Sequence, residues 1–329
     1  MRIGLTYDLK SAYLQKGFTP DEVAEFDSEE TIEGIESALR ELGHETIRIG
    51  NVTELAAALV KGLKVDLVFN ICEGLYGIGR EAQVPALLDA YRIPYTFSDP
   101  LVLSLTLHKG LTKRVIRDAG IPTAPFFLVE TADESLECEL PFPVFIKPVA
   151  EGSGKGISNK SVVNDLLSFQ SECRYLLETY HQPVLVEKLL TGREFTVGIL
   201  GTGANAKVVG VMEVNILSNA EEQTYSRFIK ENYNQRVEYT LVEGEVKDLC
   251  SEISLKAWQT LGCRDAGRID LKMDENSIPN FIEGNPLAGI NHLHSDLPIM
   301  LYKQGWRYTD LIEEIIRSAS QRIPKQNFS

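Results

Sequence analysis

Two short segments towards the carboxyl end of the chain carry residue types suited to binding a metal ion and an anion. Arg268 and Asp270 alternate with apolar residues in the first segment, and Glu283 and Asn285 do so in the second. This alternation, interrupted by the turn-forming residues 274–277, predicts a β-hairpin. If Asp270 pairs with Glu283, then Arg268 pairs with Asn285, because partner numbers in an antiparallel pair keep a constant sum. All four side chains then lie on one face.

Two carboxylates and an amide oxygen on one face form a hard-oxygen site suited to Mg²⁺. An arginine beside them can hold a phosphate or an oxyanion. Together these groups indicate chemistry on a magnesium-bound nucleotide. The alternative is a surface hairpin whose charges contact only water. The apolar residues between the charged positions count against it, because they indicate packed strands.

Residues 151–156, Glu-Gly-Ser-Gly-Lys-Gly, form a glycine-rich loop after an apolar run that ends at Pro148. The loop lacks the spacing of a P-loop, and no helix opens at its end as in a dinucleotide-binding fingerprint. Its glycines can still turn backbone N–H groups toward a phosphate. Lys147 and Lys155 favour phosphate binding over a plain hairpin turn. No His and Asp partners are positioned for Ser153 as a hydrolase nucleophile.

Residues 186–190, Val-Glu-Lys-Leu-Leu, fit a linker whose backbone pairs with an adenine edge. Glu194, close after it, can accept hydrogen bonds from ribose hydroxyls. Both segments fit ordinary strand residues as well. Lys109, Lys147 and Lys230 lie in three separate segments, and each taken alone fits a surface lysine.

Two histidines, His292 and His294, follow Gly289 closely. They are candidates for lining a substrate pocket, with a purely structural loop role as the alternative. The five histidines of the chain show no metal-binding spacing.

The chain has 329 residues and a formal charge of −14. Such a surface disfavours nucleic acid and anionic membranes. No apolar run reaches the roughly 18 residues of a membrane-spanning helix, and the amino terminus is too polar for a signal peptide. The five cysteines are scattered and show no metal-binding spacing, so we expect them to be free thiols in a reducing compartment. We therefore expect a cytoplasmic protein with small-molecule partners.

The first hundred residues alternate strands and helices. Apolar runs predict strands near 3–7, 46–49, 65–69 and 93–97, and apolar stripes predict helices near 28–42, 55–63 and 83–91. Asp27 is the expected cap of the first helix. This rhythm predicts a parallel, doubly wound sheet, whose ligands bind beyond the carboxyl ends of the strands. Two loops lie there, 8–26 and 70–74, and the length of the first favours a functional loop or lid.

The rest of the chain changes character. Strands are predicted near 143–148, 184–187, 194–200 and 207–213, and helices near 109–119, 164–180, 245–261 and 309–318. The fold class is α/β and α+β, in three domains and a tail. We expect a doubly wound parallel-sheet domain at 1–97, a small central α+β domain at 98–190, a C-terminal α+β domain at 191–322 and a tail at 323–329.

Taken in order, these segments resemble the ATP-grasp superfamily, and most closely its D-alanine–D-alanine ligase branch. The resemblance covers nearly the whole chain. It is carried by Phe-Ile-Lys-Pro at 145–148 with Glu-Gly-Ser at 151–153, by 186–197, by 256–270 and by Glu-Gly-Asn-Pro-Leu-Ala-Gly at 283–289. The ordered set is far more specific than any one member. It implies the ATP-grasp fold, in which residues 98–190 form the lid domain and residues 191–322 the catalytic domain. It also implies an ATP-dependent carboxylate–amine ligase that works through an acyl phosphate.

The resemblance also implies roles for the matching residues. Those expected to bind ATP are Lys109, Lys147, Glu151, Gly152, Ser153, Glu187, Lys188, Leu189, Leu190, Glu194 and Lys230. Those expected to bind two Mg²⁺ ions, or Mn²⁺, are Asp270, Glu283 and Asn285. Those expected to act in catalysis are Arg268, Ser153 and Gly289. Those expected on the substrate side are Glu73, His292, His294 and Ser295.

Departures from the family pattern lie on the amino-acid side. Glu73 stands in place of the family's His before a glycine, and His108 in place of the Asp before Lys109. Ser295-Asp296 stands where the family has Ser-Leu to receive the carboxylate of the acceptor, and an acid there would repel a carboxylate. The residues that match the family's nucleotide-binding positions keep the family pattern.

The resemblance therefore implies that the chain catalyses the family's reaction, whereas it leaves the identity of the substrate open. D-Ala–D-Ala, for peptidoglycan biosynthesis, is the first expectation. A different amino acid or amine in specialised metabolism is the second, and a non-catalytic ATP-binding regulatory protein the third. Family analogy implies a homodimer.

Overall fold

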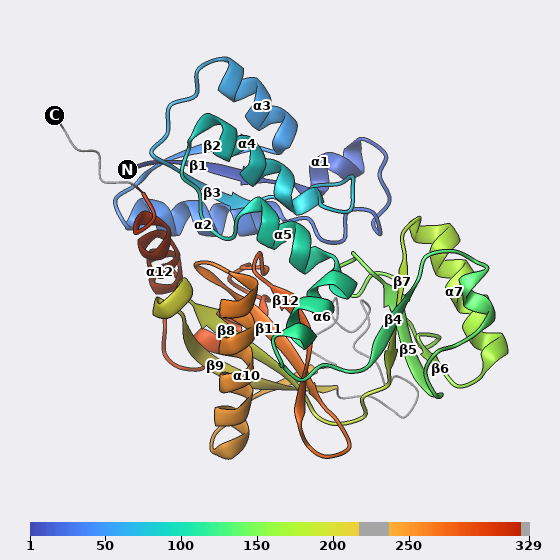
Figure 1. The fold of residues 1–329 in the computed structure, drawn as a ribbon. Helices are drawn as coiled ribbons and strands as arrows, with labels where there is room; N and C mark the ends of the chain where they lie inside the picture. The colour runs from blue at the N-terminus through green and yellow to red at the C-terminus, as the bar shows by residue number, and fades with distance from the viewer. Residues whose placement is uncertain (217–236, 324–329) are drawn as a thin grey trace.

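The computed structural model describes residues 1–216 and 237–323, in which three β-sheets succeed one another along the chain (Figure 1). The amino-terminal sheet lies above the carboxyl-terminal sheet in this view, and the central sheet lies to one side of both. None of the described helices has the length and apolar character to cross a membrane.

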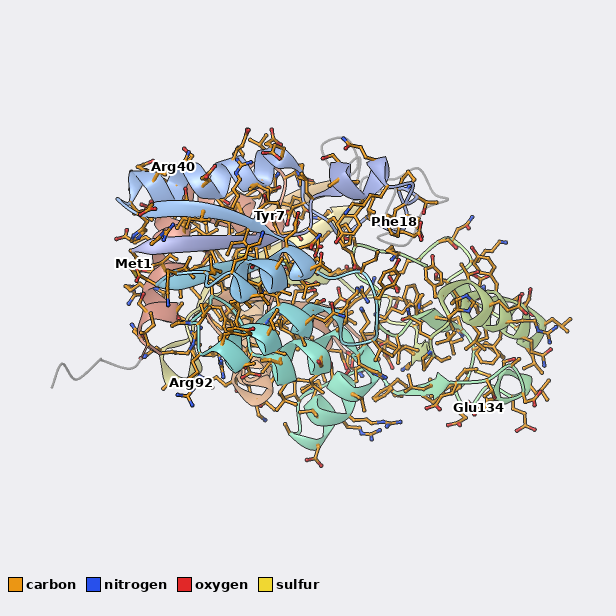
Figure 2. All side chains as sticks on the ribbon, turned by 90° about the horizontal axis from the view of Figure 1, so that it is seen from above. Met1, Tyr7, Phe18, Arg40, Arg92 and Glu134 are labelled. Atoms are coloured by element: carbon orange, nitrogen blue, oxygen red, sulfur yellow. The ribbon has the colours of Figure 1, made fainter. Side chains whose placement is uncertain are left out.

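The first sheet is parallel, as the sequence predicts. β1 (Arg2–Tyr7) lies between β2 (Glu45–Gly50) and β3 (Leu67–Ile71). The helices of this part are α1 (Lys10–Gln15), α2 (Glu29–Glu41), α3 (Val52–Val60) and α4 (Gln83–Tyr91). Figure 2 shows Met1 at one side of the molecule, Tyr7 at the far end of β1, and Phe18 beyond it, on the side where Glu134 of the central part lies. The carboxyl ends of the strands therefore point toward the central part of the chain.

The predicted starts of two helices in this region are wrong. Ser28, not Asp27, caps α2, because its side chain accepts the Thr31 N–H. The backbone of Asp27 is instead paired with that of residues 8–10. α3 begins earlier than predicted, because Asn51 forms a capping box with Glu54.

The predicted strand at 93–97 is also wrong. Only Tyr95 forms a bridge, to Val68 of β3. Phe97 has a φ of 69°, so the chain leaves the extended conformation at once. The sheet therefore has a single bridged residue where a fourth strand was expected.

The central sheet is antiparallel and has the order β4-β7-β5-β6. Its strands are β4 (Phe126–Val129), β5 (Val144–Pro148), β6 (Val162–Val163) and β7 (Val184–Lys188), with α7 (Leu166–Tyr180) packed against it. Phe169 of α7 is fully buried in a core shared with Ile146 and Val184. The sequence did not predict β4.

The third sheet is antiparallel and has the order β10-β9-β8-β11-β12. Its strands are β8 (Glu194–Leu200), β9 (Lys207–Ile216), β10 (Val237–Leu241), β11 (Ala266–Met273) and β12 (Pro279–Asn285). The helices around it are α10 (Glu245–Leu261), α11 (Asp296–Tyr302) and α12 (Tyr308–Ser320). Trp258 of α10 is completely buried against this sheet, which fixes the helix across β8 and β11.

Two helices, α5 (Pro100–Leu107) and α6 (Lys109–Asp118), connect the first sheet to the central one. Val102 and Ile116 of these helices share the apolar core of the third sheet. The core of the central sheet starts only with Val129. The helices that follow residue 98 therefore pack outside the core of the central sheet. The expected domain boundary at residue 98 remains a proposal.

Candidate active site

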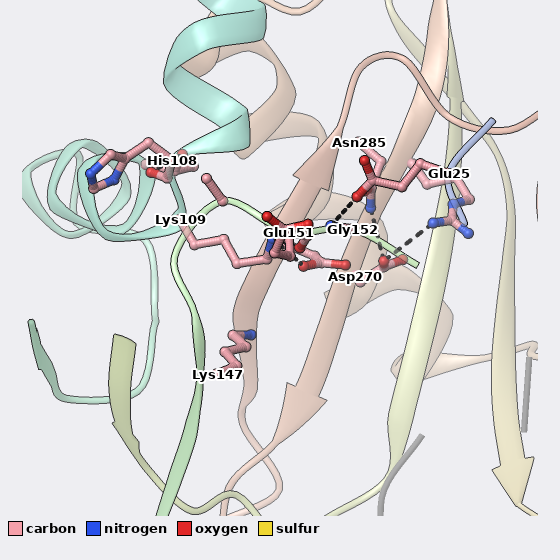
Figure 3. Close-up of polar contacts among 12 residues, drawn as sticks. Glu25, His108, Lys109, Lys147, Glu151, Gly152, Asp270 and Asn285 are labelled. Carbon is pink, nitrogen blue, oxygen red and sulfur yellow. Dashed lines mark hydrogen bonds and ion pairs between the residues drawn. The ribbon is translucent and has the colours of Figure 1, made fainter. Parts of the chain in front are cut away.

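The β11–β12 hairpin has the predicted register: Asp270 pairs with Glu283, and Arg268 with Asn285. The Asn285 side-chain amide donates to Asp270 Oδ2 at 2.9 Å, so these side chains lie on the same face (Figure 3). Thr196 of β8 donates its hydroxyl to Asp270 Oδ1 at 2.7 Å. A β-bulge follows Asp270. The prediction of one polar face on this hairpin is confirmed.

The donor set of this face fits a divalent cation. Burial raises the pKa of Asp270, and the nearby Glu283 carboxylate adds to that effect against the opposing Arg268. Positive charge beside the two carboxylates would relieve this repulsion. Within the described ranges no three His, Cys, Asp or Glu side chains form a metal-binding group. Two carboxylates and one amide suit Mg²⁺ bound together with phosphate, because Mg²⁺ keeps phosphate and water oxygens among its ligands.

Three lysines and the Glu187 carboxylate lie close to this hairpin. Lys109, the first residue of α6, lies 3.6 Å from Glu283. Lys147 of β5 lies 3.1 Å from Glu187 of β7, and Lys113 of α6 lies 2.6 Å from the other oxygen of the same carboxylate. Lys109 and Lys147 come from separate segments, as predicted, and all three lysines are buried. The interpretation of Lys109 and Lys147 as ordinary surface lysines is therefore excluded.

The glycine-rich loop is held from two sides. Lys109 Nζ donates to the Glu151 carbonyl at 2.6 Å, and Lys155 forms an ion pair with the Glu151 carboxylate at 2.6 Å. On the other side the Gly152 N–H donates to Glu25 (Figure 3). Glu25 also forms an ion pair with Arg80 at 2.7 Å. The long loop after β1 therefore contacts the glycine-rich loop of the central sheet.

A cavity of about 680 Å³ extends between the central and third sheets. Lys109, Lys147 and the glycine-rich loop line one end. Residues 187–196 of the linker and β8 line the rest, together with the hairpin residues Arg268, Asp270 and Glu283. One cavity therefore brings together cationic lysines, a glycine-rich loop and the polar face of the hairpin, which are groups suited to phosphate oxygens.

A second cavity of about 530 Å³ adjoins the first. It is lined by Glu73 and Glu81 of the amino-terminal part, and by residues 284–289 and 294–296. The two cavities share six lining residues: Lys109, Gly152, Ser153, Arg268, Glu283 and Asp296. The hairpin and the glycine-rich loop therefore stand at the junction of two compartments.

The second cavity has an acidic wall. Burial raises the pKa of Glu81 to about 8, with Glu25 adding to it while Arg80 and Lys109 oppose it. Burial likewise raises the pKa of Glu73, and the carboxylates of Glu81 and Glu25 raise it further. A cation bound beside them would lower these pKa values and an anion would raise them further, so the wall favours a cationic group over an anion.

Comparison with known proteins decides the family. A family model described as D-ala D-ala ligase C-terminus matches residues 115–317. A D-alanine–D-alanine ligase of Aquifex aeolicus is 31% identical over 287 residues, covering 87% of this chain and 93% of that protein. The chain belongs to the D-alanine–D-alanine ligase family. As a member, it is an ATP-dependent carboxylate–amine ligase with the ATP-grasp fold.

Further similarities cover most of the chain. An uncharacterized protein, y4sG, of Sinorhizobium fredii is 29% identical over 299 residues, covering 88% of this chain and 87% of that protein. The crystal structure of a Bacillus anthracis D-alanine–D-alanine ligase complexed with ATP superposes with a TM-score of 0.73 at 21% identity, covering 98% of both chains. The VanG D-Ala:D-Ser ligase of Enterococcus faecalis gives 0.72 at 19% identity, covering 97% of this chain and 99% of that one. These structures confirm the predicted fold.

The structure brings most of the residues predicted from the family pattern to the two cavities. The first is lined by Lys109, Lys147, residues 151–153, residues 187–190 and Glu194. Glu73, Gly289, His294 and Ser295 line the second. The partly exposed Lys188 side chain also forms an ion pair with Glu275 at 2.7 Å. Lys230 lies outside the described residues.

The structure does not bring His292 to the cavities that the other residues line. Its ring packs against Tyr308, with 5.6 Å between ring centroids, and against Gly34 of α2. The structural alternative for this histidine is therefore the better one. His108, a departure from the family pattern, caps α6 by accepting the Leu111 N–H and points away from the cluster (Figure 3).

The sequence did not single out Lys113, Glu25, Arg80, Thr196 or Tyr239. Lys113 follows Lys109 by four residues, so helical spacing puts both on one face, and this signal could have found it. Thr196 follows Glu194 by two residues, so strand alternation puts both on one face of β8. Glu25, Arg80 and Tyr239 could not be found in this way, because each contacts or lines the ligase site from a segment remote in sequence.

Proposed function

We propose that this ligase activates the carboxylate of one amino acid with Mg-ATP and joins it to the amine of a second substrate, releasing ADP and phosphate. The observation that carries the proposal is the junction of the two cavities. A nucleotide in the first and an amino acid in the second would bring the γ-phosphate and a carboxylate together beside Arg268 and Glu283.

On the nucleotide side, Lys109 and Lys147 bind the phosphates, and residues 151–156 cover them with backbone N–H groups. Ser153 and Gly154 have positive φ angles of 50° and 72°, which turn the backbone of this loop. Leu189 and Leu190 pack on adenine, and Glu194 accepts from the ribose. Lys230, beyond the described residues, is proposed as a further phosphate ligand.

Asp270, Glu283 and Asn285 would hold two Mg²⁺ ions. When bound, the ions supply positive charge to the β- and γ-phosphates as negative charge develops there. The neighbouring residues keep these ligands in place: Thr196 orients Asp270, and Lys109 lies beside Glu283.

A carboxylate is a poor acyl donor, because its leaving group would be oxide. Phosphorylation turns it into an acyl phosphate, whose leaving group is phosphate. A carboxylate oxygen attacks the γ-phosphorus, and the bond from that phosphorus to ADP breaks. The amine then attacks the carbonyl of the acyl phosphate, the bond to phosphate breaks, and the amine loses a proton. The Arg268 guanidinium and the Gly289 N–H stabilise the oxyanion between these steps. Loss of one such donor typically costs about 10²–10³ in rate.

Water must be excluded, because an acyl phosphate hydrolyses. The contacts of Glu25 and Arg80 with residues 150–152 hold the glycine-rich loop against the amino-terminal part of the chain. Ser153, which lines both cavities, is placed by this loop over the reacting groups. We propose that this loop is the lid of the site.

D-Ala–D-Ala is the product named for many relatives, and we propose it as the first candidate product, for peptidoglycan biosynthesis in the cytoplasm by a homodimer. A second candidate is a ligase for a different amino acid or amine. It is favoured by Asp296, which forms an ion pair with Arg268 where an acceptor carboxylate would otherwise bind.

The test is incubation with Mg-ATP and separate pools of D- and L-amino acids and amines, with phosphate release and product mass measured together. Amino-acid-dependent phosphate with a new amide product supports the proposal and identifies the substrate. ATP binding without turnover in any pool would favour the regulatory alternative.

A further inference from the structure

Lys113 is a buried cation that the proposed mechanism does not use. Its side chain has no exposed surface, and its ammonium lies 2.6 Å from the Glu187 carboxylate and donates to the Thr123 hydroxyl at 2.6 Å. Thr123 in turn donates to the Phe281 carbonyl of β12 at 2.9 Å. A lysine is almost never fully buried unless it is paired. Lys113 therefore links α6, the linker strand β7 and the metal-binding hairpin.

Glu187 is shared between two ammonium groups. Lys113 lies beside one of its oxygens and Lys147, at 3.1 Å, beside the other. Burial alone would raise the pKa of Glu187, but the two lysines lower it to about 2. Burial alone would lower the pKa of Lys147, but Glu187 and Glu283 raise it. With all three groups ionised, the cluster has a net charge of one positive unit.

The three members differ in access to the nucleotide cavity. Lys147 and Glu187 line it, whereas Lys113 lies behind them. An ammonium has three donors and no acceptor. Because Lys113 binds one Glu187 oxygen, Lys147 needs to satisfy only the other and keeps donors for a phosphate. Without Lys113, Lys147 and Glu187 would form a closed, neutral pair facing the triphosphate.

We propose that Lys113 is a positioning residue for the nucleotide, which never touches ATP but keeps Lys147 available to its phosphates by binding Glu187 from behind. The inference rests on the proposed function only in assigning Lys147 to the phosphates. It adds that the strength of phosphate binding is set by the charge of the whole Lys113–Glu187–Lys147 cluster.

The test compares the dissociation constants of Mg-ATP and adenosine by calorimetry on the full chain. Lys113→Met is expected to weaken Mg-ATP binding about tenfold to a hundredfold, the range of one lost charge-assisted contact, and to leave adenosine binding unchanged. Arg114→Met, which removes the exposed positive charge next to it on α6, is expected to bind both as the wild type does. Lys113→Gln, which keeps a polar group for Thr123, replaces Lys113→Met if the latter does not fold.

The double variant Lys113→Met/Glu187→Gln separates positioning from packing. It restores the net charge of the cluster, so its Mg-ATP affinity is expected to recover toward the wild-type value. Equal Mg-ATP affinity of Lys113→Met and wild type, or a double variant no better than the single one, overturns the inference. A wild type that binds no Mg-ATP instead overturns the proposed function itself, so the two failures are distinct.

Discussion

Asp296, the first residue of α11, forms an ion pair with Arg268 of β11. Tyr239 donates its hydroxyl to the other Asp296 oxygen at 2.7 Å. The proposed catalytic arginine therefore meets an acid of its own chain at the junction of the two cavities. A carboxylate-bearing acceptor has to compete with Asp296 for Arg268.

Asp296→Asn removes this competition while keeping the size of the side chain. We expect the KM for acceptors that carry a carboxylate beside the amine to fall about tenfold, the scale of one charge-assisted contact. The KM for acceptors without that carboxylate should stay constant or rise. Steady-state kinetics on matched amino acids and their amides measures both, and Asp248→Asn, in the exposed first turn of α10, is the control. Equal KM changes for both acceptor types would contradict this role.

Glu25→Gln should uncouple ATP cleavage from product formation. Glu25 binds Arg80 and the Gly152 N–H, and the neutral amide holds the loop less firmly. More acyl phosphate then meets water, so phosphate released should exceed amide product. The measurement is the ratio of the two products. Glu22→Gln, exposed on the same loop, should keep a one-to-one ratio, and a one-to-one ratio in Glu25→Gln would count against the lid.

The lowered pKa of Glu187 predicts that the free energy of unfolding falls in acid. Its pKa in the folded state, about 2, lies below the usual 4.5 because Lys113 and Lys147 outweigh the effect of burial. A lowered pKa contributes stability that is present above the usual value and is lost as pH falls through the folded one. The difference corresponds to about 3 kcal/mol.

Denaturant unfolding between roughly pH 5 and pH 2 measures this contribution. The wild-type free energy of unfolding should fall across that window, and the slope should be shallower in Glu187→Gln. Glu252→Gln, exposed on α10, should keep the wild-type slope. Identical slopes in all three proteins would remove Glu187 from the acid response.

Asp270→Asn tests the metal face of the hairpin. We expect kcat to fall about a thousandfold or more, because a metal ligand contributes several kcal/mol to charge stabilisation in phosphoryl transfer. The thermal midpoint should stay near that of the wild type, since the amide can still accept from Thr196. Glu275→Gln, in the turn of the same hairpin and paired only at the surface, should be fully active. Wild-type turnover in Asp270→Asn would exclude the residue as a metal ligand.

The hairpin register could be predicted because strand side chains alternate with period two and apolar residues mark the inner face. The absence of a strand at 93–97 could not be predicted, since the positive φ of Phe97 leaves no trace in an apolar run. The contact of Lys113 with Glu187 joins two segments far apart in sequence. No local pattern encodes such a contact, although the four-residue spacing from Lys109 hints at the shared helix face.

His292 shows that closeness in sequence does not by itself place a side chain in a pocket. Its closeness to Gly289 and His294 made it a candidate for the substrate pocket. The loop after β12 instead turns its ring onto Tyr308 and α2, while His294 lines the cavity. Two residues in an irregular loop have no fixed relation of side-chain direction, so spacing alone could not distinguish them.

The central claim is that the donor carboxylate is activated by phosphorylation. Labelling both carboxylate oxygens of the donor with heavy oxygen and following the phosphate by mass spectrometry tests it most directly, because the attacking oxygen stays with the phosphate when the amide forms. The account predicts that the released phosphate carries one heavy oxygen atom for each amide formed. Unlabelled phosphate alongside amide product would contradict it.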